Sequence, residues 1–180
     1  MSRILAFFLE PRMGDDASRA TVLLRAAVGG VFLVSGAVKF LFDNQGPGRF
    51  AKLGFSAPGE VASFVGGVEI VCGALLVVGL FARLAAAPLV IDMIVALVTT
   101  KLPLLFGAGP EPVAAPPKTG FWAFAYQARL DGTMLLACAY IVAVGAGLWS
   151  VDAILARRRS EGALLGKVRT RRDDAAHPAE

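Results

Sequence analysis

Residues 20–42 read ATVLLRAAVGGVFLVSGAVKFLF, and this stretch decides the fold because it is apolar over the length that a membrane helix needs. About 20 mostly apolar residues are enough to cross the roughly 30 Å hydrocarbon core of a bilayer. Residues 61–81, 84–105 and 131–155 meet the same criterion. The predicted fold class is therefore all-α, a four-helix transmembrane bundle with antiparallel up-down order.

The rest of the chain is short and polar. Hydrophobic residues make up 56% of the 180 residues, which is more than a soluble domain of this size requires for its core. We expect residues 1–19 to form an N-terminal cytoplasmic or interfacial segment, residues 20–155 the membrane domain, and residues 156–180 a basic, disordered cytoplasmic tail. The apolar run at residues 4–9 is too short for a secretion signal.

The distribution of Lys and Arg predicts the orientation. Cations near the ends of membrane helices favour the cytoplasmic side. They precede the first span, occupy the turn between the second and third spans at Arg83, and follow the fourth span at residues 157–159. The opposite loops also hold cations, but an even number of spans and the basic tail place both termini in the cytoplasm. The net charge of +4 comes largely from this tail, which favours anionic lipid headgroups over nucleic acid as its partner.

Ionisable residues lie well inside three of the four spans. Arg25 and Lys39 belong to the first, Glu69 to the second and Asp92 to the third. A charge at that depth costs several kcal/mol, so each is expected to be paired, to face the bundle interior and to mark a function.

Heights along the helices predict the partners of these charges. With about 1.5 Å of rise per residue, the calculated heights in the bilayer place Arg25 within reach of Asp92 and Lys39 within reach of Glu69. Lys101 and Asp131, at the outer ends of the third and fourth spans, share the level of Lys39. We take Lys39 and Glu69 as candidate catalytic residues, and the remaining four as a structural charge network, namely Arg25, Asp92, Lys101 and Asp131.

Small residues share helical faces with the charges. Gly29 and Gly36 lie on the stripe that carries Arg25 and Lys39, and Gly66 and Gly73 flank Glu69, in the pattern V-G-G-V-x-x-V-x-G-A at residues 28–37 and again at residues 65–74. Glycines on one face allow two membrane helices to approach closely. A plain packing seam accounts for these glycines but leaves the charges unexplained.

The small number of cysteine and histidine residues limits the cofactors that the protein could bind. Cys72 and Cys138 are single residues on different spans without a Cys-x-x-Cys motif, and the only histidine, His177, lies in the tail. No haem or metal is therefore expected. The two cysteines are either small apolar core residues or redox groups, and the sequence leaves that open.

The pattern of the first two spans resembles the DoxX family of small membrane proteins. The matching positions are Arg25, Gly29, Phe32, Ser35, Gly36 and Lys39, followed by Gly66, Glu69, Gly73, Gly79 and Arg83. The resemblance extends over residues 20–152. It implies a multi-pass protein of the bacterial cytoplasmic membrane that is linked to redox chemistry, since the family is similar to the large subunit of an archaeal thiosulfate:quinone oxidoreductase and some members belong to membrane complexes that handle thiols and oxidative stress.

Three functions fit these residues. The first is a redox-associated subunit in which the charge cluster contacts a quinone headgroup or a small sulfur anion, and a buried carboxylate such as Glu69 relays protons. The second is a non-catalytic scaffold that recruits soluble oxidoreductases through the tail and the loop at residues 106–129. The third is a small proton-coupled transporter, which would need a homo-oligomer to provide alternating access.

Overall fold

Residues 15–108 and 117–159 are described by a computed structural model, and all the regular structure in these ranges is helical. The elements are α2 (Asp15–Leu41), α3 (Pro47–Lys52), α4 (Pro58–Val78), α5 (Ala82–Ala96) and α6 (Phe121–Val144). A π-helical turn (Leu97–Lys101) and a 3₁₀ turn (Leu102–Phe106) extend α5. The expectations for the N-terminal segment before residue 15 and for the tail after residue 159 lie outside the described residues.

Within the described residues, four helices are long and apolar enough to cross a membrane, which confirms the predicted all-α fold class. They cover Arg19–Leu41, Pro58–Val78, Ala82–Phe106 and Phe121–Val144. Large apolar side chains such as Leu23, Phe64 and Leu136 are exposed on the outside of these helices. Exposed apolar surface on every long helix is what lipid contact requires, so the chain is a multi-pass integral membrane protein.

The predicted bounds of the fourth span were wrong. Sequence hydropathy placed it at residues 131–155, whereas α6 begins at Phe121 and ends at Val144. The helix ends because Gly145 and Gly147 adopt positive φ angles of 95° and 78°, which a continuing helix cannot contain. Residues 151–159 then form a separate helix, which takes in residues 156–159 of the predicted tail.

The predicted long loop is correspondingly shorter. The segment at residues 106–129 was expected to be a connection, yet its second half forms the first turns of α6. Phe121 and Trp122 are exposed there with their rings in an edge-to-face contact. Aromatic side chains at the end of a membrane helix are typical of the belt at the membrane–water interface.

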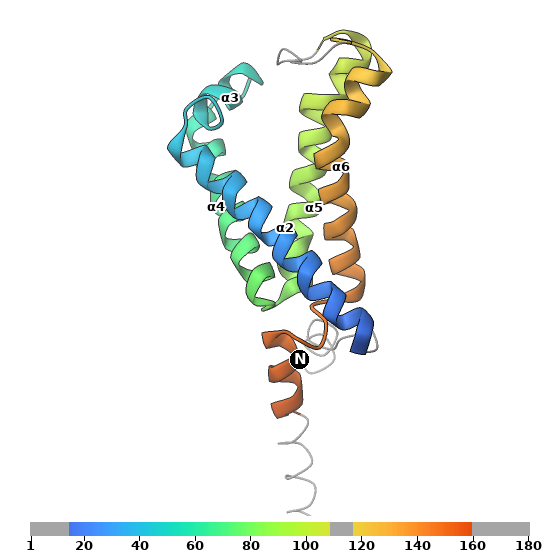
Figure 1. The fold of residues 1–180 in the computed structure, drawn as a ribbon. Helices are drawn as coiled ribbons and strands as arrows, with labels where there is room; N and C mark the ends of the chain where they lie inside the picture. The colour runs from blue at the N-terminus through green and yellow to red at the C-terminus, as the bar shows by residue number, and fades with distance from the viewer. Residues whose placement is uncertain (1–14, 109–116, 160–180) are drawn as a thin grey trace, which may run out of the picture.

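The four long helices form two arms (Figure 1). One arm consists of α2 and α4 with the short α3 at its end, and the other consists of α5 and α6. The arms meet at the end where the turn after α4 leads into α5, and they diverge toward the end that carries α3. We call these the closed end and the open end.

Four glycines bring α2 and α4 together. A Cβ atom on Gly36 would lie 2.7 Å from the Gly66 carbonyl oxygen, and one on Gly29 would lie 2.6 Å from the Gly73 carbonyl oxygen. Because the helices are antiparallel, the first glycine of one repeat faces the second glycine of the other. Backbone contact of this kind is the arrangement that the two small-residue stripes predict.

Candidate functional site

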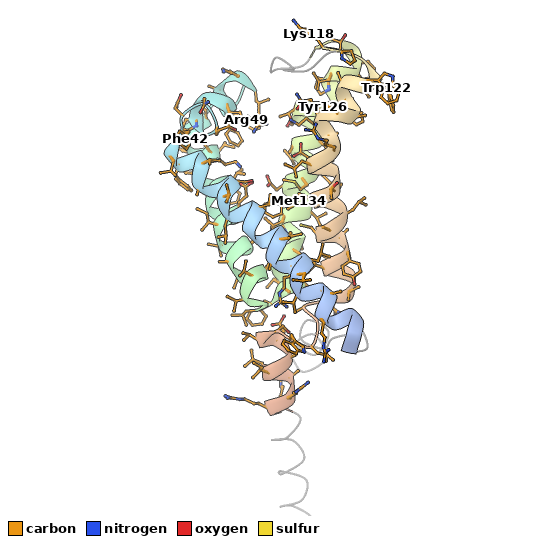
Figure 2. All side chains as sticks on the ribbon, viewed as in Figure 1. Phe42, Arg49, Lys118, Trp122, Tyr126 and Met134 are labelled. Atoms are coloured by element: carbon orange, nitrogen blue, oxygen red, sulfur yellow. The ribbon has the colours of Figure 1, made fainter. Side chains whose placement is uncertain are left out.

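A cavity lies between the two arms at the open end, and we call it the inter-arm cavity. Its volume is about 390 Å³. Residues of α2, α3, α4, α5 and α6 line it, and Figure 2 shows Arg49 on the α3 side of the opening between the arms and Tyr126 on the α6 side. The side chains of Phe50, Phe55 and Phe64 make its wall on the α3 and α4 side strongly apolar.

Lys39 and Glu69 form an ion pair at the inner end of this cavity. Lys39 Nζ lies 2.5 Å from Glu69 Oε2, and Glu69 is only 2% exposed. Lys39 Nζ also donates to the Ser35 carbonyl oxygen one turn earlier at 3.4 Å. The predicted pairing of these two residues is confirmed, and the ion pair joins the two long helices of one arm.

The predicted pairing of Arg25 with Asp92 was wrong. Asp92 lines the inter-arm cavity together with Lys39 and Glu69. Its Oδ2 atom is buried and has no hydrogen-bond partner among the described residues. The predicted heights assumed parallel, upright helices, whereas the arm of α2 and α4 is inclined to the other arm (Figure 1).

Two carboxyl groups side by side constrain the protonation of the cavity. Ionised carboxylates only accept hydrogen bonds, so Glu69 and Asp92 can bond to each other only when one of them carries a proton. With that proton in place, the single positive charge of Lys39 balances the remaining negative charge. The cavity therefore brings two acidic side chains together with one lysine.

A π-helical turn shapes the wall of the cavity on α5. The Thr99 and Thr100 side chains line the cavity, while their hydroxyl groups donate to the carbonyl oxygens of Val95 at 2.7 Å and Ala96 at 2.6 Å. At the end of this turn Lys101 Nζ lies 3.9 Å from Asp131 Oδ2 on α6. π-Turns inside helices occur frequently at functional sites, because the inserted residue redirects the side chains around it.

Arg25 has its partners at the closed end. Its guanidinium donates to the carbonyl oxygens of Ala146 at 2.5 Å and Trp149 at 3.0 Å, in the segment that follows α6. Arg25 is 2% exposed, and these bonds compensate part of the cost of burying its charge, while its Nε has no hydrogen-bond partner among the described residues. Arg83 donates in the same region to the Val144 carbonyl oxygen at 3.0 Å.

Asp152 completes this group, and sequence reasoning missed it. Its carboxylate accepts the backbone N–H groups of Phe81 at 2.7 Å and Ala82 at 3.0 Å, at the start of α5. Burial raises the pKa of Asp152, against the opposing effects of these N–H groups and of the Arg25 charge. The overlooked signal was an acidic residue just after the glycines that end α6, because carboxylates commonly cap helix N-termini.

The two cysteines lie in the hydrophobic core. Cys72 and Cys138 are both buried and neither forms a disulfide. They pack with apolar side chains such as Phe32, Leu76 and Ile141. Within residues 15–108 and 117–159, no group of three or more His, Cys, Asp or Glu side chains is placed to hold a metal ion.

Comparison with known proteins supports the family resemblance. The family model described as DoxX matches residues 20–102 of the chain. An uncharacterized membrane protein of Mycobacterium tuberculosis (strain ATCC 25618 / H37Rv) is 44% identical over 140 residues, which cover 77% of this chain and 83% of that protein. No solved structure matches the chain.

Proposed function

The chain belongs to the DoxX family, and we propose that it is a redox-associated subunit of the bacterial cytoplasmic membrane that binds a quinone in the inter-arm cavity. The observation that carries this proposal is the two-part lining of the cavity. Aromatic and aliphatic walls lead inward to Lys39, Glu69 and Asp92. A quinone has the same two-part character, because its ring is apolar and its two carbonyl oxygens accept hydrogen bonds.

The size and the donors of the cavity fit such a molecule. A volume of about 390 Å³ lies within the range of roughly 300 to 1,000 Å³ that is usual for small-molecule pockets. The Lys39 ammonium has three N–H donors and the Arg49 guanidinium has five, so both can donate to a carbonyl oxygen besides their protein contacts. Lys39 and Arg49 therefore provide one cationic donor for each of the two carbonyl oxygens of a quinone.

The acidic side chains supply the protons that quinone chemistry needs. A quinone that becomes a quinol takes up two electrons and two protons. In this proposal Lys39 binds a carbonyl oxygen, and Glu69 and Asp92 pass two protons in succession to the two carbonyl oxygens, while water that enters the cavity reprotonates the acidic side chains after each transfer. The electrons come from a soluble oxidoreductase partner, since the predicted spans contain no histidine and no Cys-x-x-Cys pair.

The proposed orientation places both termini in the cytoplasm. The closed end carries Arg83 and the cations at residues 157–159, whereas Arg49, Lys52, Lys118 and Arg129 lie toward the open end. The cations before residue 15 and after residue 159 add to the excess on the side of the termini. Under the positive-inside rule the inter-arm cavity then opens toward the outer leaflet.

Binding of a short-chain quinone to the full chain in lipid nanodiscs tests the proposal. We expect saturable binding of decylubiquinone or menadione by equilibrium dialysis, and a loss of about tenfold or more in affinity for Lys39→Gln, because a charged donor to a buried acceptor is removed. Lys52→Gln is the matched control, since this lysine is exposed on α3 and does not line the cavity. Equal binding by wild type and Lys39→Gln would reject the proposed site.

Further measurements on the same nanodisc preparation, and on proteoliposomes, distinguish this function from the alternatives. Thiosulfate that competes with the quinone, or thiosulfate-dependent quinone reduction that Glu69→Gln abolishes, would identify a sulfur anion as the second substrate. Copurification of soluble oxidoreductases without any quinone binding would favour a scaffold. Uptake of a solute into proteoliposomes without either property would favour a transporter.

A further inference from the structure

Trp149 stands between two surface furrows at the closed end of the bundle. The first furrow has a volume of about 350 Å³ and is lined by Arg19, Val22, Leu23 and Trp149. The second has a volume of about 580 Å³, and Trp149 lines it together with Val78, Leu148, Ser150, Val151, Ile154 and Arg157. Trp149 is 65% exposed and is shared by the linings of both furrows.

Each furrow combines one arginine with an apolar surface. The Arg19 guanidinium carbon lies 5.7 Å from the centre of the Trp149 ring, as in a cation–π contact. Leu23 borders the first furrow, Ile154 borders the second, and both side chains are exposed. A ligand that fits these furrows therefore has an anionic group and apolar chains.

The furrows lie at the level where phospholipid headgroups begin. The first membrane span starts at Arg19 and the second ends at Val78, so the two furrows mark the same boundary of the bilayer from two helices. Trp and Arg side chains at such a boundary face the headgroups and the first carbons of the acyl chains.

The charge of this surface selects the headgroup. Arg19 and the arginines at residues 157–159 are all exposed, whereas the carboxylate of Asp152 is buried and bonded to backbone N–H groups. A positive surface of this kind favours an anionic lipid over a zwitterionic one.

We infer that the two furrows beside Trp149 form a binding site for an anionic phospholipid, with the phosphate held by Arg19 and Arg157 and one acyl chain in each furrow. The site lies at the opposite end of the bundle from the inter-arm cavity and is independent of the proposed quinone function. It would anchor the segment after α6, whose carbonyl groups Arg25 binds from the inside, against the bilayer.

The intrinsic fluorescence of Trp149 can report on lipid binding at this site. It contains two tryptophans, Trp122 and Trp149, and Trp122 is 70% exposed near the open end. In a Trp122→Phe variant all tryptophan fluorescence comes from Trp149, and in a Trp149→Phe variant all of it comes from Trp122. Lipids with brominated acyl chains quench a tryptophan that they contact, so the two variants compare two places on one molecule.

The experiment measures quenching in bilayers that mix brominated and plain lipids. For the Trp149 reporter we expect brominated phosphatidylglycerol to occupy the site several times more strongly than brominated phosphatidylcholine. For the Trp122 reporter we expect a ratio near one. Adding both Arg19→Gln and Arg157→Gln to the Trp149 reporter should reduce this preference to a ratio near one, because the two cations that hold the phosphate are removed. Lys118→Gln with Arg129→Gln is the matched control, and it should leave the preference unchanged.

Three results would overturn the inference. The first is equal quenching of Trp149 by the two headgroups. The second is the same preference at Trp122 as at Trp149, which would mean attraction to the whole surface and not a built site. The third is a preference that survives removal of both arginines. Because the substituted side chains are exposed, circular dichroism should show unchanged helix content in every variant.

Discussion

Lys39 Nζ on α2 lies 2.5 Å from Glu69 Oε2 on α4, and the pair closes the inner end of the inter-arm cavity. Removal of either partner leaves the other charge buried, at a cost of about 3 to 5 kcal/mol. We predict that Lys39→Ala and Glu69→Ala each lower the stability of the folded protein by that order. The double variant should be no less stable than either single variant, measured by unfolding in mixed micelles. Fully additive losses would show that the two groups do not interact in the folded protein.

The contact between α2 and α4 predicts opposite effects for two glycines that are six residues apart. Gly36→Ala places a Cβ 2.7 Å from the Gly66 carbonyl oxygen and the Ile70 side chain, so the helices must separate. We expect a loss of about 1 to 3 kcal/mol. Gly30→Ala meets no atom within 4 Å and should be neutral or stabilising by up to about 1 kcal/mol, because alanine favours the helix. Equal effects of the two substitutions in the same unfolding assay would contradict the observed helix contact.

Double-mutant cycles can test whether Arg25 interacts with Asp152 or with Asp92. The structure places its guanidinium near Asp152 at the closed end and not beside Asp92. Double-mutant cycles should therefore give a coupling of about 0.5 to 3 kcal/mol between Arg25→Gln and Asp152→Asn. The cycle of Arg25→Gln with Asp92→Asn should be additive to within about 0.5 kcal/mol. The reverse result would restore the pairing that helical heights predicted.

Asp152 should make the stability depend on pH in a defined direction. Its folded-state pKa is raised by burial above the unfolded value of about 3.9, so folding favours the protonated form. The free energy of unfolding should fall as the pH rises from about 4 through the raised pKa, and it should be constant for this residue outside that window. In Asp152→Asn this contribution disappears. The check is the difference in unfolding free energy between wild type and variant as a function of pH, and a difference that grows in favour of wild type with rising pH would contradict the direction.

The membrane helices and one of the two expected charge pairs followed from local patterns. Apolar runs of about 20 residues identify spans because the bilayer imposes one length on every helix that crosses it. Lys39 and Glu69 lie on adjacent antiparallel helices with matching glycine stripes, so counting residues from the connecting turn was enough to bring them together. The bounds of the fourth span were not predictable in this way, since apolar residues continue in the sequence beyond the glycines that end α6.

The partners of Arg25 and Asp92 depend on the inclination of one arm against the other. The contact of Arg25 with backbone carbonyl groups after α6 has no sequence signature, because every residue has a carbonyl group. Only the tertiary structure determines which carbonyl groups are left without a helical partner and lie near Arg25. The sequence by itself determined that charges would lie inside an all-helical membrane bundle and that glycines would join its first two spans. The tertiary structure alone decided that Asp92 meets Glu69 in a cavity while Arg25 and Asp152 lie at the closed end, because the tilt and the ends of helices arise from contacts between distant segments.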